Sequence, residues 1–326
     1  MTIPEIFDAF HRLQVLIVGD IMLDSYVWGK VERISPEAPV PVVLAQRKEF
    51  RLGGAGNVVL NVDALGAKAV ICSVVGEDVY GNELLNILKA NGLSCEGIIQ
   101  SHQRITTVKE RIIAGSQQVV RVDTETDQFI TETERQTLLD RVKQLAERAD
   151  VIIFEDYDKG VLSAGTIAEI IAFANGRGIP TVVDPKKRNF LHYHEATLFK
   201  PNLKELREGL NVRVDAKNPA ELEAVLHQLK ELLRVQGTLI TLSERGVFID
   251  FGAEKHYLPA HVRQIADVSG AGDTVVSIAA CCLALGLPPR QLAALANLGG
   301  GLVCESVGVV PINRELLKQE ALREGL

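Results

Sequence analysis

Asp273 stands at the end of a glycine-rich turn and at the start of an apolar segment. Residues 267–274 read DVSGAGDT, and residues 275–286 are apolar at nearly every position, which predicts a buried helix. The glycines on either side of Ala271 leave backbone N–H groups open at the N-terminus of this helix, where anions bind. A carboxylate beside a bound phosphate is useful if an alcohol must be deprotonated there. The alternative interpretation is that Asp273 only caps the helix, because Asp is a favoured N-cap residue.

A second glycine-rich turn lies at residues 51–57, which read RLGGAGN and lead into another predicted helix. The turn lacks the Lys and the Ser or Thr that a P-loop requires, so it is not a Walker A site. Asn57 offers both a donor and an acceptor and therefore suits a polyol. Asp20 and Asp24 follow the apolar run 14–19, at the end of a predicted strand, where a carboxylate can accept hydrogen bonds from sugar hydroxyls.

Asn202 and Glu205 come directly after Pro201, and their spacing places them on one side of the first turn of a helix. Both side chains offer oxygen atoms, which Mg²⁺ prefers, either directly or through water. The same spacing also fits a capping pair, in which Glu205 lies three residues after the N-cap Asn202. The sequence leaves both interpretations open.

Short apolar runs alternate with helical patterns along the chain. Each run predicts a buried parallel strand that ends in polar residues; the runs lie at 14–19, 69–75, 151–154, 181–183, 197–199 and 238–242. This alternation predicts an α/β fold with a mostly parallel sheet, whose carboxyl edge binds ligands. Residues 106–113 and 117–123 predict a hairpin, and the proline-containing segment 26–44 predicts short extended pieces. We expect these parts to form a small sheet above the ligand edge.

Composition and charge exclude several classes of function. The chain has 326 residues and a net charge of -7, which argues against a nucleic-acid-binding surface. Residues 1–10 lack the basic head and apolar run of a secretory signal, and the helix after Asp273 is too short to span a bilayer. The 5 cysteines form no CxxC motif and are expected to be reduced thiols, as in a cytoplasmic protein without a membrane partner.

Four motifs together resemble the ribokinase-like (PfkB) carbohydrate kinases. Residues 53–57 (GGAGN) resemble the first signature of that family, and residues 267–274 resemble the second. Residues 202–205 match its Asn-x-x-Glu motif, and residues 241–246 (TLSERG) resemble its Thr-Leu-Gly-x-x-Gly motif, with Ser243 in place of the usual glycine. The motifs occur in the family's order and span nearly the whole chain. The resemblance implies a three-layer α/β/α fold with a mostly parallel central sheet and a small β lid.

The resemblance also implies a domain plan and a role for each motif. Residues 1–326 would form one kinase domain, with a lid built from about 25–50 and 104–123. Asp273 would be the general base, and the backbone amides of the turn before it would hold the transferred phosphoryl group; these are Gly270, Ala271 and Gly272. The sugar would be bound by Asp24, Gly53, Gly54 and Asn57. The nucleotide would contact Asn202, Glu205, Thr241, Ser243, Glu244, Gly246, Gly270, Gly272 and Asn297.

The cofactors follow from the same resemblance. Asn202 and Glu205 would organise Mg²⁺ and the phosphates of ATP, with water between the ion and the side chains as one option. Many members of the family also bind a monovalent cation, which here would be K⁺ near Asp267 and Ser269.

A further set of motifs resembles the branch of this family that acts on D-glycero-β-D-manno-heptose 7-phosphate. These motifs lie at 19–24, 28–29, 33–42, 106–109, 117–118 and 156–160. This resemblance implies transfer of the γ-phosphoryl group of ATP to the anomeric O1, which gives the 1,7-bisphosphate, a precursor of ADP-heptose and the lipopolysaccharide core. Candidates to hold the 7-phosphate are Lys186 first, then Arg104 and Lys109. Some relatives carry a fused nucleotidyltransferase; the chain ends soon after Pro311, so that second activity is not expected.

Two other functions remain open at this point. The chain could phosphorylate another sugar or sugar phosphate, or it could be a non-catalytic sugar or nucleotide sensor on the same fold. The presence of Asp273 between the turn and the helix argues against the sensor, which needs no base. The lid has exposed strand edges that could pair with those of a second subunit, so we predict a homodimer formed through the lid.

Overall fold

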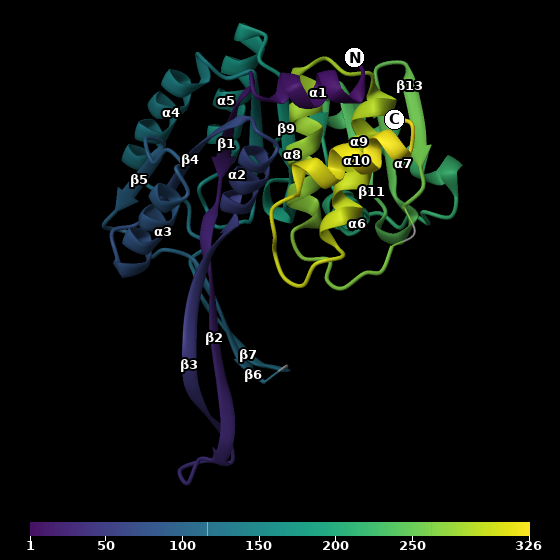
Figure 1. Cartoon of the computed structure of the whole chain (residues 1–326). Helices are drawn as coiled ribbons and strands as arrows, with labels where there is room; N and C mark the ends of the chain where they lie inside the picture. Colours follow the sequence, from purple (N-terminus) through teal and green to yellow (C-terminus); the bar gives the residue numbers. More distant parts are fainter. Residues whose placement is uncertain (116, 262) are drawn as a thin grey trace.

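A nine-stranded sheet forms the centre of the computed structural model, which describes residues 1–115, 117–261 and 263–326 (Figure 1). The strand order is β13-β12-β11-β10-β9-β8-β1-β4-β5. Strands from β5 to β11 in this order run parallel, whereas β12 and β13 pair antiparallel. Their bounds are β1 (Gln14–Gly19), β4 (Lys68–Gly76), β5 (Ile98–Ser101), β8 (Val151–Glu155), β9 (Thr181–Asp184), β10 (Leu198–Phe199), β11 (Gly237–Thr241), β12 (Val247–Phe251) and β13 (Glu254–Leu258).

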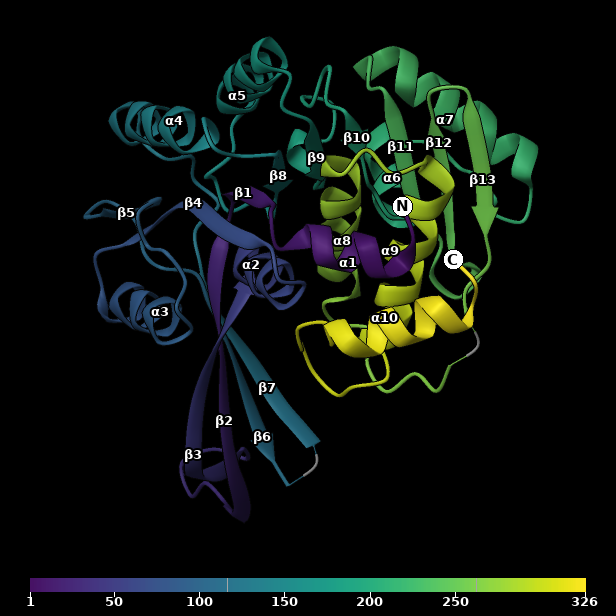
Figure 2. The same cartoon turned by 45° about the horizontal axis from the view of Figure 1, so that its top comes forward.

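Helices cover both faces of this sheet (Figure 2). Alternate residues of β1 point to opposite faces, so Val15 and Ile17 join one hydrophobic cluster and Leu16 and Val18 join the other. The first cluster includes α1 (Ile3–Phe10), α2 (Ala55–Ala64), α3 (Val79–Ala90), α8 (Ala271–Ala284), α9 (Pro289–Val303) and α10 (Arg314–Arg323). The second includes α4 (Glu132–Ala146), α5 (Ala164–Arg177), α6 (Leu203–Leu210) and α7 (Pro219–Leu233). The expected three-layer α/β/α fold is therefore confirmed.

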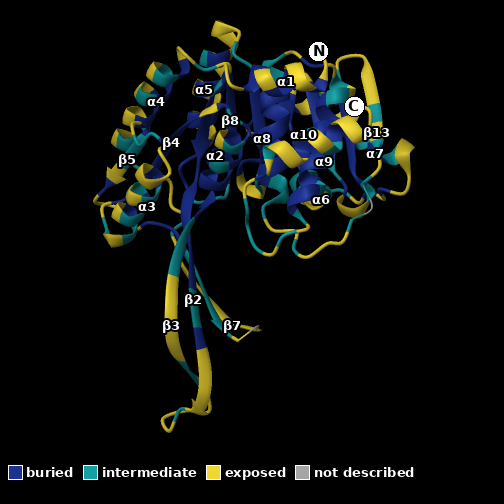
Figure 3. Cartoon of the chain, in the orientation of Figure 1, coloured by how far each residue is buried: buried dark blue, intermediate teal, exposed yellow. Residues whose placement is uncertain are grey.

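A separate four-stranded sheet projects from the body, in the order β3-β2-β6-β7 (Figure 1). We call it the small sheet; it consists of β2 (Ile21–Ile34), β3 (Pro41–Gly54), β6 (Val108–Ala114) and β7 (Gln117–Thr124). The outer parts of β2 and β3 are exposed, whereas their inner ends are buried against the body (Figure 3).

The expectation of short extended pieces in segment 26–44 was wrong. Both β2 and β3 are 14 residues long. Register shifts between Trp28 and Gly29 and between Val31 and Arg33 interrupt the alternation of side chains along β2. The antiparallel pairing of β2 with β3 continues past both shifts. A bulge of this kind removes the period-two pattern from the sequence without ending the strand.

Helix boundaries follow the local signals in the sequence. Thr131 forms a capping box with Glu134 at the start of α4, and Ser163 accepts a hydrogen bond from the Thr166 amide at the start of α5. Gly286, with φ +65°, follows the C-terminus of α8. Across the described ranges, no helix combines the length and the apolar character needed to cross a membrane.

Candidate active site

Asp273 lies on the first turn of α8, where the expected glycine-rich turn enters the helix. The N-cap is Gly270, in the left-handed region at φ +80°, so Asp273 is not the cap. Its two carboxylate oxygens instead accept hydrogen bonds from side chains: Asn57 Nδ2 at 2.6 Å and the Tyr157 hydroxyl at 3.0 Å. Asp273 is only 7% exposed. The structure therefore rejects the capping interpretation and presents this carboxylate to other functional groups.

Burial raises the pKa of Asp273 from 3.8 to about 6. The Asn57 hydrogen bond opposes this rise in pKa, the charge of Asp184 adds to it, and the Tyr157 hydrogen bond opposes it again. A carboxylate with a pKa near 6 is ionised at neutral pH and is a much stronger base than an exposed Asp. Within the described chain, the amides of Gly272 and Asp273 find no acceptor, as expected at a helix N-terminus, and these N–H groups can receive an anion.

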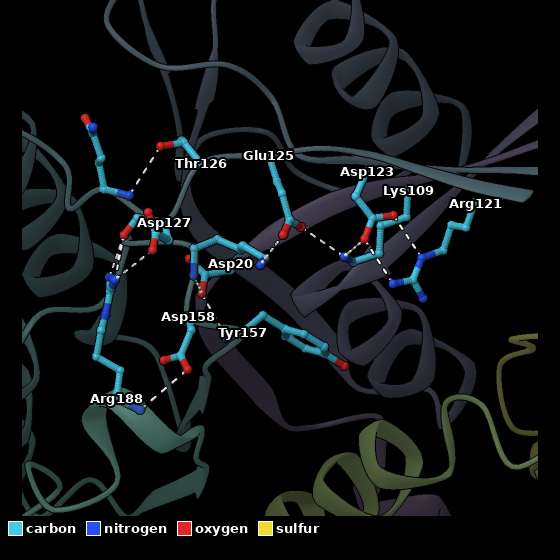
Figure 4. Close-up of polar contacts among 12 residues, drawn as sticks. Asp20, Lys109, Arg121, Asp123, Glu125, Thr126, Asp127, Tyr157, Asp158 and Arg188 are labelled. Carbon is cyan, nitrogen blue, oxygen red and sulfur yellow. Dashed lines mark hydrogen bonds and ion pairs between the residues drawn. The ribbon is translucent and has the colours of Figure 1, made fainter.

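Tyr157 belongs to the motif at 156–160, but the sequence assigned it no role in the site. It lies in the loop after β8, and Asp20 holds this loop by accepting backbone hydrogen bonds from Tyr157, Lys159 and Val161. Figure 4 shows Asp20 and Tyr157 in this arrangement. The Asp20 carboxylate is thus occupied by the loop, not left free for sugar hydroxyls. Arg104 supports the same loop, because its Nη2 donates to the carbonyl of Lys159.

A buried acidic cluster lies beside Asp273 at the carboxyl edge of the sheet. Glu155 and Asp184 end the neighbouring strands β8 and β9, and their carboxylates lie within 4.8 Å of each other and of Asp273. Burial raises the pKa of Glu155 well above 4.5, and the charges of Asp184 and Asp273 raise it further. Lys200, after β10, partly balances the cluster, with its Nζ 2.9 Å from Asp184 Oδ2. These contacts join residues that are far apart in the chain, so only their position at strand ends could have indicated them.

The predicted Mg²⁺ ligands Asn202 and Glu205 form a capping box in this structure. Asn202 Oδ1 accepts from the Glu205 amide, and Glu205 Oε2 accepts from the Asn202 amide, each at 2.8 Å. Lys186 Nζ lies 2.6 Å from Glu205 Oε1 and 3.9 Å from Asp184. Lys186, the first candidate for the sugar phosphate, therefore lies among the residues predicted to hold the nucleotide phosphates.

The donor set beside Asp273 fits a divalent cation. Among the described residues, neither carboxylate oxygen of Glu155 nor Oδ1 of Asp184 has a hydrogen-bond partner, although all three atoms are buried. Such carboxylate oxygens are the ligands that Mg²⁺ prefers. Asp184 also lies near Lys186, which bonds Glu205, so the cluster and the Asn-x-x-Glu motif share one region of the sheet edge.

Several of the residues predicted for the nucleotide lie at the carboxyl end of β11 and in the loop that follows it. Asn202 forms an isolated parallel bridge with Thr241 at the end of β11. Ser243 and Glu244 lie in the short 3₁₀ helix η2 (Ser243–Arg245), and Ser243 has a positive φ of +55°, the region that the family's usual glycine adopts without strain. Gly246 packs against residues 258–260, and Asn297 Nδ2 donates to the Pro259 carbonyl at 2.8 Å. The loop and α9 thus meet at segment 258–260.

Among the residues predicted for the sugar, Asn57 contacts Asp273, and the others lie at the inner ends of β2 and β3. Asn57 is 1% exposed and bonds Asp273 directly, and Asp24 is 5% exposed. A side chain at Gly53 would come within 2.6 Å of Asp24 Oδ2, and Gly54, at φ +57°, starts the turn into α2. Arg111 of β6, which was not among the predicted site residues, donates to Asp24.

Three further predicted residues, Lys109, Asp267 and Ser269, form contacts away from Asp273. Lys109 Nζ contacts Asp123 at 3.3 Å and Glu125 at 3.0 Å (Figure 4), and Glu125 also contacts Lys159. Asp267 accepts hydrogen bonds from the amide and hydroxyl of Ser269, so this pair forms a local turn. The amide hydrogen bond of Ser269 is the largest factor that holds the pKa of Asp267 below 3.8. A monovalent cation at Asp267 and Ser269 stays a prediction.

The chain belongs to the pfkB family of carbohydrate kinases, whose family model matches residues 12–315. It is 40% identical over 325 residues to the "Bifunctional protein HldE" of Syntrophotalea carbinolica. The aligned region covers 99% of this chain and 66% of that protein. The chain is 41% identical over 303 residues to the protein of the same name from Wolinella succinogenes. The aligned region covers 93% of this chain and 63% of that protein. The chain thus spans about two thirds of the length of these relatives.

Solved structures support the same fold. Phosphofructokinase-2 from Escherichia coli, solved in complex with potassium, has a TM-score of 0.78 at 17% identity, with 96% of this chain and 98% of that chain covered. Ribokinase from Arabidopsis thaliana, solved with ribose and ATP, has a TM-score of 0.72 at 15% identity, with 94% and 99% covered. The ribokinase-like fold expected from the motifs is therefore confirmed.

Proposed function

We propose that the protein transfers the γ-phosphoryl group of ATP to the anomeric O1 of D-glycero-β-D-manno-heptose 7-phosphate. The observation that carries this proposal is the buried Asp273 carboxylate, which is held by Asn57 and Tyr157 beside open amides at the N-terminus of α8. The choice of acceptor rests on the motif resemblance and on the similarity to the HldE proteins. A sensor would gain nothing from a buried, costly base at this position.

In this mechanism Asp273 accepts the proton of the acceptor hydroxyl as that oxygen attacks the γ-phosphorus, and the bond from the γ-phosphorus to the bridging oxygen breaks, so that ADP leaves. The Gly272 and Asp273 amides, with the rest of the turn from Gly270, stabilise the charge on the transferred group. Asp24 and Asn57 orient the sugar, and the small sheet keeps water away from the phosphoryl group.

Asp184, Glu205 and Glu155 are the residues that would hold Mg²⁺, near Lys186. When bound with ATP, this ion supplies charge neutralisation at the phosphate oxygens. Lys186 and Lys200 add fixed positive charge at the same edge of the sheet. The raised pKa of Lys186 fits this role: burial opposes its charge, but Asp184 and Glu205 outweigh burial, so the side chain stays protonated.

A panel of acceptors tests the proposal. ADP release is measured with heptose 7-phosphate, unphosphorylated heptose, ribose and fructose 6-phosphate at equal concentrations, and the product is analysed by ³¹P NMR. We expect the highest kcat/KM with heptose 7-phosphate and a new phosphate ester on the anomeric carbon. A clear preference for an unphosphorylated sugar would exclude the proposed acceptor, and binding without ADP release would favour a sensor.

We also propose that two copies associate through their small sheets. β7 lies at one edge of this sheet, and all of its residues Gln117–Thr124 are exposed, including Val120 and Val122. Exposed apolar edge strands are usually covered, and a second copy would cover this one. Light scattering at micromolar concentration should give the mass of a dimer, and a lysine at Val122 should shift it to the monomer. A monomeric mass for the unchanged chain would contradict this.

A further inference from the structure

One face of the small sheet is rich in positive charge. Tyr26 and Trp28 lie on this face of β2; Tyr26 is opposite Glu49 and Arg111, and Trp28 is opposite Arg47 on β3. We call it the basic face; it carries Arg47, Arg51, Lys109, Arg111 and Arg121 against Asp24, Glu49 and Asp123. Cations outnumber carboxylates, so the face has capacity for an anion.

Two arginines of the basic face flank the same aromatic ring. The guanidinium carbon of Arg51 lies 5.0 Å from the centre of the Tyr26 ring, and that of Arg111 lies 5.3 Å from it. Such stacking holds the planar guanidinium groups in fixed positions. Arg51 donates through Nε to Glu49, and Arg111 donates through Nη1 to Asp24. Within the described residues, Nη1 and Nη2 of Arg51 and Nε and Nη2 of Arg111 have no hydrogen-bond partner.

The predicted sugar ligands Asp24 and Asn57 contact Arg111 and Asp273, respectively. Arg51 reaches from the small sheet to the body: its Nη1 lies 3.7 Å from the position that a Cβ on Gly308 would occupy. An acceptor whose hydroxyl meets Asp273 would therefore extend its other end toward Arg51 and Arg111.

Of the cations that the sequence suggested for this task, the two lysines contact carboxylates and Arg104 is largely buried. Lys109 contacts two carboxylates, and Lys186 contacts Glu205 and Asp184. Arg104 donates through Nη2 to the Lys159 carbonyl, and its Nε and Nη1 have no partner among the described residues but are buried, so they are not accessible to a ligand from solvent. Arg51 has 36% of its side chain exposed and Arg111 has 22%, so both remain accessible to a ligand.

We propose that Arg51 and Arg111 form the subsite for the distal phosphate of the acceptor, and that they select phosphorylated over unphosphorylated sugars. Two planar guanidinium groups with free N–H donors suit a phosphate monoester dianion, which accepts several charge-assisted hydrogen bonds. This subsite rests on the proposed sugar-phosphate kinase function.

Steady-state kinetics of Arg51→Met and Arg111→Lys test the subsite. Arg111→Lys keeps a positive charge beside Asp24 but removes the planar fork, so it separates phosphate binding from the support of Asp24. We expect each variant to raise the KM for heptose 7-phosphate by about 10- to 100-fold, the usual effect of losing charge-assisted hydrogen bonds. The KM for ATP and the kcat/KM for unphosphorylated heptose should stay unchanged. Arg47→Met is the control: Arg47 lies on the same face, 63% exposed, over Trp28, and should behave as the unchanged protein.

Inorganic phosphate provides a second readout that does not require turnover of a sugar. It should inhibit the unchanged enzyme competitively against the sugar phosphate, and Arg51→Met should weaken this inhibition. Equal KM values in all variants, with an unchanged enzyme that does use heptose 7-phosphate, would overturn the subsite and leave the proposed function intact. An unchanged enzyme that uses only unphosphorylated sugars would overturn both.

Discussion

Asp273→Asn should lower kcat by about 10²- to 10⁴-fold, because loss of a general base typically has this effect. The KM values for ATP and the sugar phosphate should change far less, since Asn fills the same space. Initial rates of ADP formation at saturating substrates measure the change. A kcat within threefold of the unchanged enzyme would remove Asp273 from the mechanism.

The same variant should not be less stable. The folded-state pKa of Asp273 is raised from 3.8 to about 6, so its ionised form opposes folding at every pH above about 6. This shift corresponds to roughly 3 kcal/mol at neutral pH. Asn removes the charge but places an amide opposite Asn57 Nδ2, which offsets part of the gain. We therefore expect an unfolding temperature at or above that of the unchanged protein, which separates loss of the base from loss of the fold.

Lys200→Met should lower the free energy of unfolding by about 3–5 kcal/mol, because it leaves Asp184 buried without its partner. Lys200 is 2% exposed, and Glu155 and Asp273 lie beside the same carboxylate. Burial opposes the charge of Lys200, but Asp184 and Glu205 raise its pKa above 10.5. Its charge therefore stabilises the fold at all pH values below 10.5, and urea unfolding at pH 7.5 measures the full effect.

Two further variants control this experiment. Lys200→Met with Asp184→Asn should recover most of the lost stability, since it removes the unpaired charge. Lys255→Met removes an ion pair of similar length, 2.8 Å to Glu223, but on an exposed surface, and its urea midpoint should not move. A loss equal to that of Lys255→Met would show that Lys200 does not balance the acidic cluster.

Features that depend on a few neighbouring residues, such as turns and helix caps, could be predicted from the sequence. The glycine-rich turns at Gly54 and Gly270 adopt positive φ, and Thr131 and Ser163, residue types that favour the N-cap, cap α4 and α5. Asn57 lies on the first turn of α2 as predicted, and the strand ends converge on one edge of the sheet, because parallel strands share their carboxyl side.

Side-chain contacts between segments far apart in the chain could not be predicted from the sequence. Tyr157 is 116 residues from Asp273, and no local pattern connects them. Lys186 was expected at the sugar phosphate because it is basic and lies on the functional edge, and Arg104 because it is basic and lies beside the predicted lid hairpin. The sequence does not show which carboxylate or carbonyl each one contacts. The sequence likewise suggested that Asp20 binds the sugar, but in the structure its carboxylate accepts hydrogen bonds from backbone amides of the loop at 157–161. In each case the partner is set by tertiary packing.

The pH dependence of kcat tests the central claim, that Asp273 acts as an ionised base in a buried site. Its pKa of about 6 predicts that kcat is constant above pH 7 and falls tenfold per unit below pH 6. Tyr157→Phe removes a hydrogen bond that lowers this pKa, so its profile should move to higher pH. Protonation of the nucleotide affects both proteins equally, so the displacement between the two midpoints reports on Asp273. A kcat that stays constant from pH 8 to pH 5 in the folded enzyme, with no displacement in Tyr157→Phe, would contradict the account.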